Sequence, residues 1–185
     1  MERSLTMILS LKEIYTKYNT ESPKKGGDKG TVHSYIENYY ETALINYRSS
    51  AKTVLEIGIN QGHSLMMWNE YFINAEIIGV DIKIPEVNTG CRMICGDATD
   101  STTFNDLGNF DVIIDDGSHK LEHQLLSFNI LFPKLNSGGI YIIEDVVDIN
   151  KTKENFLNLH TDVEIFDFRS FKNRDDDVIV QIIKK

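Results

Sequence analysis

Three acidic residues stand directly after two apolar segments of the chain. Residues 111–114 and 139–143 are short apolar runs typical of buried strands; Asp116 follows the first, and Glu144 and Asp145 follow the second. We expect these strands to be neighbours in a parallel sheet, so that the three carboxylates converge at its carboxyl edge. Like charges held so close are costly unless a cation neutralises them. Oxygen ligands without a cysteine predict Mg²⁺, or else Mn²⁺ or Ca²⁺, in preference to zinc.

His119 is the candidate general base beside this acidic cluster. It lies three residues after Asp116, at the predicted start of the following helix. Imidazole, with an ordinary pKa of about 6.5, accepts a hydroxyl proton at neutral pH, and a metal ion beside it would lower the pKa of that hydroxyl. The alternative is that His119 caps the helix and the acids are solvated. His63 and His123 are weaker candidates for the base.

A glycine-containing loop is the candidate cofactor site. The strand that ends at Ile57 leads through Gly58, Asn60 and Gly62 into a helix, and glycine lets a backbone approach a ligand closely. A tight strand-to-helix turn without a ligand is the alternative. Glu56 decides which ligand fits, because a carboxylate here would repel the pyrophosphate of a dinucleotide. S-adenosylmethionine (SAM) has no phosphate and carries an ammonium and a sulfonium, so the loop favours SAM over NAD.

Two more acids follow the next two predicted strands. Asp81 ends the segment at residues 77–81, where a carboxylate can accept both hydroxyl protons of a ribose. Asp97 follows the third strand and could accept from an adenine amino group while Ala98 packs on the ring. Each acid alone is equally consistent with a solvated loop, but acids in register at successive strand ends favour a cofactor site.

Strands and helices alternate along the chain, which predicts an α/β fold with a parallel sheet and helices on both faces. The predicted strands are residues 53–57, 76–81, 93–95, 111–114, 139–143, 163–168 and 178–183. The predicted helices are residues 5–18, 32–48, 64–72, 119–132 and 151–159, with a polar loop at residues 19–31 and a polar turn at 172–177. The last two strands have no helix between them and should form an antiparallel hairpin.

Size and composition fit a single domain. The chain has 185 residues, and we expect a helical and loop cap at residues 1–49 and a Rossmann-like core at residues 50–185. The net charge of −9 disfavours a nucleic-acid partner. Cys91 and Cys95 are too far apart on an extended segment for a disulfide, and no apolar run approaches the roughly 20 residues that span a membrane. These features predict a cytoplasmic protein.

The segments at residues 54–62, 77–81 and 96–98 resemble the successive cofactor motifs of class I SAM-dependent methyltransferases. The resemblance covers residues 50–185 and implies a seven-stranded, mostly parallel sheet with strand order 3-2-1-4-5-7-6. Asn60 is a departure, because the family usually has a second glycine there.

Within that class, the chain resembles the metal-dependent sugar O-methyltransferases of macrolide biosynthesis, of the mycinosyl or macrocin type. Residues 115–119 and 143–145 carry the resemblance. It implies that Asp116, Glu144 and Asp145 bind the metal, that His119 is the base, and that Asp115 faces the cofactor.

The segment at residues 28–35 also resembles a part of those enzymes that closes over the cofactor. Lys29 would then pair with the SAM carboxylate and Tyr35 would cover the methionine end; an exposed lysine and a core tyrosine are the alternative. The chain lacks the large N-terminal extension of those enzymes, which leaves its assembly and its acceptor open: a homo-oligomer and one module of a longer protein are the alternatives.

The leading hypothesis is therefore methyl transfer from SAM to a hydroxyl of a sugar or glycan, assisted by a divalent metal, with His119 as the base. A Mg²⁺-dependent methyltransferase of the catechol type acting on a flat diol is an alternative, as is a SAM-binding module without catalysis. An NAD-dependent oxidoreductase is disfavoured by Glu56. The acceptor pocket should lie among the loops at residues 19–35, 146–152 and 169–177.

Overall fold

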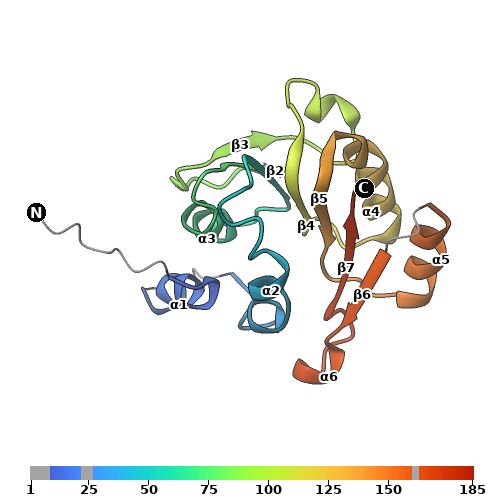
Figure 1. Cartoon of the computed structure of the whole chain (residues 1–185), viewed down its shortest axis with the longest axis horizontal. Coiled ribbons are helices and arrows are strands. Elements are labelled where there is room, and N and C mark those ends of the chain that lie inside the picture. Colours follow the sequence, from blue (N-terminus) through green and yellow to red (C-terminus); the bar gives the residue numbers. More distant parts are fainter. Residues whose placement is uncertain (1–8, 22–26, 160–162) are drawn as a thin grey trace, which may run out of the picture.

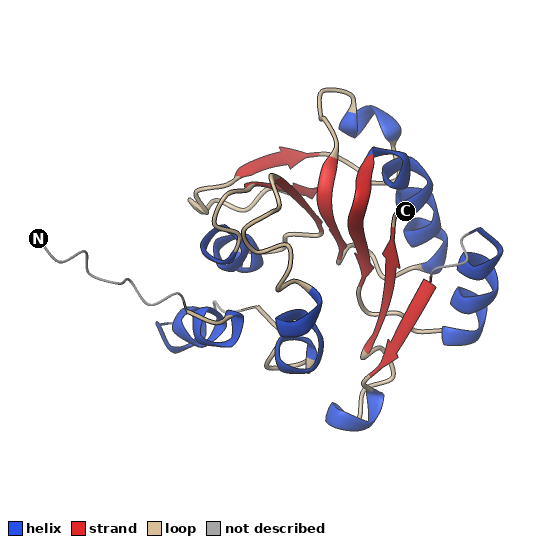
Figure 2. Ribbon diagram, in the orientation of Figure 1, coloured by secondary structure: helices blue, strands red, loops and turns tan. Residues whose placement is uncertain are grey.

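Seven strands form one sheet through the middle of the molecule (Figure 1, Figure 2). A computed structural model of the chain describes residues 9–21, 27–159 and 163–185. The strands are β1 (Thr53–Ile57), β2 (Glu76–Asp81), β3 (Arg92–Cys95), β4 (Phe110–Asp115), β5 (Leu135–Ile143), β6 (Val163–Asp167) and β7 (Val178–Ile183). Their order is β3-β2-β1-β4-β5-β7-β6, and only the pairs β5–β7 and β6–β7 are antiparallel. The predicted fold class, strand order and terminal hairpin are confirmed.

The central strands are mainly apolar because both faces of the sheet are covered. Successive side chains of a strand point to opposite faces, so Val54 and Val112 belong to one buried cluster while Leu55 and Ile113 belong to another. All four side chains are fully buried. The sheet therefore separates two hydrophobic cores.

Helices lie on both faces of the sheet (Figure 1). The helices α1 (Leu11–Glu21), α2 (Glu41–Ala43) and α3 (His63–Tyr71), with the π-helix η1 (Ile36–Tyr40), cover one face. The helices α4 (Leu121–Leu131) and α5 (Ile149–Leu159) cover the other. Short helical turns are η2 (Ser101–Phe104), η3 (Phe132–Lys134) and α6 (Arg169–Lys172). In the described parts of the chain, no helix combines the length and the apolar character needed to cross a bilayer.

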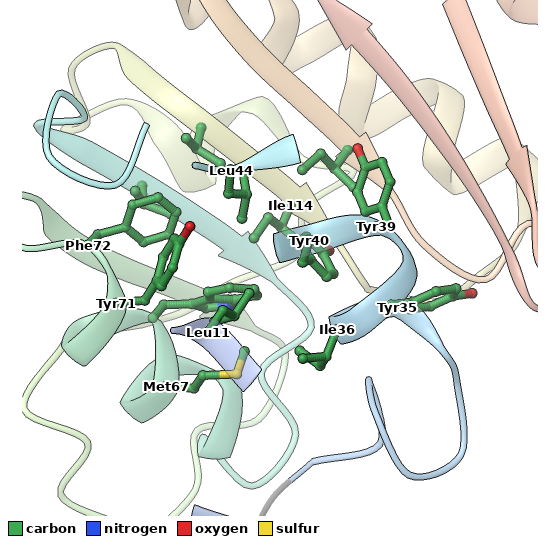
Figure 3. Close-up of a cluster of buried hydrophobic side chains, with 14 of the residues drawn as sticks. Leu11, Tyr35, Ile36, Tyr39, Tyr40, Leu44, Met67, Tyr71, Phe72 and Ile114 are labelled. Atoms are coloured by element: carbon green, nitrogen blue, oxygen red, sulfur yellow. The ribbon is translucent and has the colours of Figure 1, made fainter. Parts of the chain in front are cut away.

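The single helix predicted at residues 32–48 is wrong. The structure has η1 followed by the short α2, and the chain then continues in turns. The wider π-turn directs three tyrosine hydroxyls to separate polar partners: Tyr35 to Asp145, Tyr39 to Gln181 and Tyr40 to Glu144. Figure 3 shows the side chains of Tyr35, Tyr39 and Tyr40 leaving this segment in different directions, with Tyr35 pointing away from the other two. Tertiary contacts of the tyrosines thus override the helical pattern of the segment.

Several predicted boundaries also shift. The first helix begins at Leu11 because Ser10 and Glu13 cap it reciprocally, each side chain bonding to the other's backbone N–H; residues 5–8 lie outside the described residues. The helix predicted from residue 119 begins at Leu121. The strand predicted from residue 139 begins at Leu135, next to a shift in its register with β4. The division at residues 49 and 50 stays a prediction.

The glycine loop packs directly against the end of β4. Gly58 has φ 79°, and a Cβ there would lie 1.9 Å from the carbonyl oxygen of Asp116. The backbone N–H of Asp116 donates to the carbonyl of Ile57 at 2.9 Å. Asn60 has φ 43°, so this departure from glycine falls at a left-handed position that asparagine tolerates. The glycine loop and the acidic end of β4 are therefore packed backbone against backbone.

Substituting Gly58 by alanine should be much more damaging than substituting other glycines. We expect Gly58→Ala to lower the free energy of unfolding by about 2–5 kcal/mol, from about 1–2 kcal/mol for the left-handed backbone and about 1–3 kcal/mol for the overlap. Gly138→Ala (φ 76° with nothing near its added Cβ) isolates the backbone cost, and Gly108→Ala meets neither. Urea unfolding of the three variants measures these differences; equal losses at Gly58 and Gly138 would contradict the close packing.

Candidate active site

The acids at the ends of β4 and β5 meet around the ammonium group of Lys29. Its Nζ lies 2.6 Å from Oδ2 of Asp116 and 2.5 Å from Oε1 of Glu144. Oε1 of Glu56, from the end of β1, is 3.5 Å away. Lys29 is only 2% exposed, so this cation and its partners are shielded from solvent. The predicted convergence of the strand ends is observed, and a lysine from the N-terminal segment occupies its centre.

Lys29 remains charged at this buried position. Burial alone would lower its pKa, but the three carboxylates beside it raise the pKa of Lys29 well above its usual range. Burial raises the pKa of Glu144 well above its usual range, even though Lys29 opposes this. Burial acts in the same direction on Asp116, but Lys29 and His119 outweigh it and lower the pKa of Asp116. The structure thus combines one fixed positive charge with at least one firmly ionised carboxylate.

Three side chains facing one another form the candidate metal site. Nε2 of His119 lies 3.2 Å from Oδ1 of Asp116 and 3.7 Å from Oδ2 of Asp145, and one ligand atom from each of the three lies within 4.8 Å of the others. The two carboxylates fit a divalent ion such as Mg²⁺ or Mn²⁺, and the imidazole lies beside them. Glu144 lies apart from this set, because its Oε1 accepts hydrogen bonds from both Lys29 and Tyr40. The predicted role of Glu144 as a ligand stays a prediction.

His119 lies in the loop before α4, with φ 58° and a side chain that is 37% exposed. The hydrogen bond with Asp116 raises the pKa of His119, while burial opposes the rise. The imidazole is therefore both accessible and paired with a carboxylate that stabilises its protonated form.

Residues of the N-terminal segment contact one carboxylate oxygen of Asp145. The hydroxyl of Tyr35 donates to its Oδ1 at 2.7 Å, and Nδ1 of His33 lies 3.4 Å from the same oxygen. His33 also lies 3.4 Å from Oδ1 of Asp177 and stacks on the ring of Tyr35. Burial raises the pKa of Asp145. The sequence interpretation missed His33, Asp177 and the hydroxyl of Tyr40, since no local pattern links residues more than a hundred positions apart.

A cavity of about 280 Å³ lies beside the metal candidate, at the carboxyl ends of the strands. Its wall includes five predicted cofactor residues: Gly58, Asp81, Asp97, Ala98 and Asp115. A wider cleft continues from it past Lys29, Asn60, Asp116 and His119. The cavity and the acidic cluster therefore share one opening, as the strand-end argument predicts.

Several predicted cofactor residues form hydrogen bonds with other residues of the chain. Glu56 is fully buried below the loop and accepts from Oγ of Ser64 at 2.6 Å and from the indole N–H of Trp68 at 3.1 Å. Oδ2 of Asp81 accepts from the backbone N–H groups of Ile59 and Asn60 and so holds the loop in shape. Burial raises the pKa of Glu56, while Lys29 opposes the rise.

The remaining predicted cofactor residues also have observed positions. Gly62 precedes α3 in a left-handed conformation. Asp97 accepts from the backbone N–H of Thr99. Lys29 and Tyr35 contact acids of the cluster, as described above. The roles of all these residues toward SAM stay predictions.

The chain is similar to known sugar methyltransferases over part of their length. The 8-demethyl-8-alpha-L-rhamnosyl tetracenomycin-C 2'-O-methyltransferase of Streptomyces olivaceus is 37% identical over 140 residues, 66% of this chain and 36% of that protein. The demethylmacrocin O-methyltransferase of Streptomyces fradiae is 36% identical over 149 residues, 74% of this chain and 36% of that protein. The chain thus spans about a third of the length of these curated relatives. No family model matches the sequence.

Among solved structures, the MycE methyltransferase of the mycinamycin biosynthetic pathway, in complex with Mg and SAH, matches with a TM-score of 0.72 and 25% identity. The match covers 95% of this chain and 55% of that chain. Sheet order, glycine loop and strand-end acids together define the class I methyltransferase fold, and the chain belongs to the class I SAM-dependent methyltransferases. Its curated relatives within that class are sugar O-methyltransferases, which confirms the resemblance inferred from the sequence.

The titration of Asp115 should be visible in the stability of the protein. Burial raises the pKa of Asp115 to about 6, although hydrogen bonds from Ser127 and Gly117 oppose this. The pKa of an unfolded aspartate is about 3.9, so the folded state binds the additional proton. The stability contributed by Asp115 is therefore full below about pH 4 and is lost as the pH rises through about 6.

Asp115→Asn removes this titration. Between pH 4 and pH 7, we expect the wild type to lose about 2–3 kcal/mol of unfolding free energy relative to the variant. Urea unfolding in EDTA across this pH range measures the difference. A difference that is independent of pH would contradict the raised pKa.

Proposed function

We propose that the chain transfers a methyl group from SAM to a hydroxyl of a sugar or glycan with the help of a divalent metal ion. The observation that carries the proposal is the shared opening: Asp116 and His119, whose ligand atoms lie within 4.8 Å of one from Asp145, line the cleft that continues into the cavity at the glycine loop. The relatives named as sugar O-methyltransferases, and the MycE structure that contains Mg and SAH, support it. Activity and acceptor are proposals because the chain matches only part of those proteins.

The cavity would hold the adenosine part of the cofactor. SAM supplies an electrophilic methyl group on a sulfonium. Asp81, at the end of β2, would accept the ribose hydroxyl protons, and Asp97 and Ala98, which also line the cavity, would contact the adenine ring. The acids near the glycine loop favour a cationic cofactor by charge. This chain thus contributes binding and orientation, which can supply about 7–11 kcal/mol of the barrier reduction in well-ordered systems.

The triad of Asp116, His119 and Asp145 would supply both the metal ligands and the general base. Asp116 and Asp145 are the carboxylates that would bind the ion, which supplies positive charge that lowers the pKa of a nearby hydroxyl. His119, reached from the cleft, would take the hydroxyl proton on the ring nitrogen that does not face Asp116. Oδ1 of Asp116 then stabilises the resulting imidazolium, as its hydrogen bond at 3.2 Å already does in raising the pKa of His119.

Removal of the metal should stop the reaction. We expect EDTA to abolish methylation of a rhamnosyl glycoside and Mg²⁺ or Mn²⁺ to restore it, measured as SAH release with labelled SAM. A catechol presented in parallel should be methylated more slowly, because the proposal assigns a sugar acceptor. Full activity in EDTA would contradict the metal role, and preference for the catechol would contradict the acceptor class. SAM binding without turnover on either acceptor would indicate a binding module.

Removing the imidazole of His119 should slow methyl transfer and leave the binding of SAH unchanged. We expect His119→Ala to retain the wild-type affinity for SAH in calorimetry and to lower kcat by about 10²–10⁴-fold. In the wild type, kcat should fall at acidic pH, because protonation of His119 removes the base. The variant should lack this acidic limb. An unchanged pH profile in His119→Ala would assign the proton transfer to another group.

A further inference from the structure

Two hydrogen-bonded side chains of the cavity wall have no part in the proposed methyl transfer. Ser118 and His123 both line the cavity of about 280 Å³, and Oγ of Ser118 lies 2.8 Å from Nδ1 of His123. As a general base, His123 is the weaker candidate in the sequence. In the structure its Nδ1 is engaged by the serine, so the pair belongs to the cavity that the proposed function assigns to adenosine.

The direction of this hydrogen bond follows from the other ring nitrogen of His123. Nε2 lies 3.7 Å from Oε1 of Glu122. A neutral imidazole carries its proton on one nitrogen only, and the nitrogen beside a carboxylate is favoured. Nδ1 is then an acceptor, and the hydroxyl of Ser118 must donate to it. Toward the cavity, Oγ of Ser118 therefore acts as an acceptor, because its single proton is already used.

His123 is held in place by its backbone. Its N–H donates to the carbonyl oxygen of Lys120 at 2.9 Å, in the first turn of α4, and its carbonyl oxygen accepts from Oγ of Ser127 at 3.0 Å. With the backbone fixed, the imidazole has few side-chain rotamers to adopt. A serine hydroxyl alone rotates to suit any ligand, and the fixed imidazole removes this freedom from Ser118.

The pair lies near the part of the cavity where adenine would bind. Asp97 and Ala98, the predicted adenine contacts, line the same cavity. Hydrogen bonds from Thr99 lower the pKa of Asp97, and His123 lies close enough to lower it further through its charge. Oδ1 of Asp97 already accepts from both the backbone N–H and the hydroxyl of Thr99. Ser118 thus adds a second acceptor for an amino group at this place.

We propose that Ser118 and His123 select the base of the cofactor: the oxygen of Ser118 accepts from the exocyclic amino group of adenine, and His123 is the positioning residue that keeps this oxygen an acceptor. The 6-oxo group of hypoxanthine is itself an acceptor and would face Ser118 with no proton between them. Such an unpaired contact is costly inside a cavity. The inference rests on the proposed placement of adenosine and assigns the recognition of its base.

The affinities for SAH and for S-inosyl-L-homocysteine, in which an oxo group replaces the amino group, test this selection. By calorimetry of the full chain, we expect the wild type to bind SAH roughly 10–100-fold more tightly, the usual effect of leaving a buried polar group unpaired. Ser118→Ala should lower this ratio at least about fivefold, because it removes the acceptor. The matched control Ser137→Ala, at an exposed position of β5, should leave the ratio unchanged. An unchanged ratio in Ser118→Ala would overturn the inference.

His123→Phe tests whether the imidazole acts through Ser118. Phenylalanine keeps a planar ring but has no acceptor, so the hydroxyl of Ser118 becomes free to donate to the 6-oxo group. We expect the affinity for SAH to stay within about threefold of the wild type and the affinity for S-inosyl-L-homocysteine to rise at least about threefold. Losses by the same factor for both ligands would show a merely structural role and overturn the assignment to His123.

The tautomer of His123 is measured directly by nuclear magnetic resonance. Long-range nitrogen–proton correlation spectra of the ¹⁵N-labelled chain with bound SAH, at pH 8, show which ring nitrogen carries the proton of the neutral imidazole. We expect the proton on Nε2. A proton on Nδ1 would leave the hydroxyl of Ser118 free to donate, and would contradict the positioning role.

The two proposals fail in different ways. A wild-type chain that binds no SAH would overturn the placement of adenosine, and the base selection with it. A wild type that binds SAH and S-inosyl-L-homocysteine equally would overturn the base selection alone and leave the proposed function standing.

Discussion

The buried ammonium of Lys29 is the interaction on which the site depends. It is surrounded by carboxylates from the ends of three different strands, β1, β4 and β5, and it is supplied by a segment that precedes the whole sheet. Burying so many acids without a cation would cost several kcal/mol for each ion, by the usual magnitude of desolvation. The ion pairs therefore tie the N-terminal segment to the carboxyl edge of the sheet, and the tyrosines of that segment complete the attachment.

The sheet explains why cofactor cavity and acidic cluster are adjacent. Parallel strands present all their carboxyl ends at one edge, and β1 and β4 are direct neighbours. At Gly58 the backbone of the loop touches the backbone of Asp116, with no room for a side chain. A residue that shapes the cofactor loop and a residue that would bind metal are thus in van der Waals contact. This short separation is what a methyl transfer to a nearby hydroxyl requires.

The sequence alone predicted the parts of the fold and of the site that follow from local sequence patterns. Strand alternation and the strand-end acids led to the sheet and to the convergence of Asp116, Glu144 and Asp145, because parallel topology alone brings such ends together. It did not predict that Lys29 would lie among them. Its partners Asp116 and Glu144 are 87 and 115 residues away, and nothing in a polar loop indicates which distant acid a lysine meets. The π-helix was missed for a similar reason, since its form follows from the distant partners of Tyr35, Tyr39 and Tyr40.

Anomalous diffraction from a crystal of the chain grown with SAH and Mn²⁺ would locate both the metal and the cofactor. We expect one manganese peak within bonding distance of Asp116 and Asp145, beside His119, with SAH in the cavity at the glycine loop. A manganese ion bound elsewhere, or none in a crystal that contains SAH, would contradict the metal-assisted mechanism.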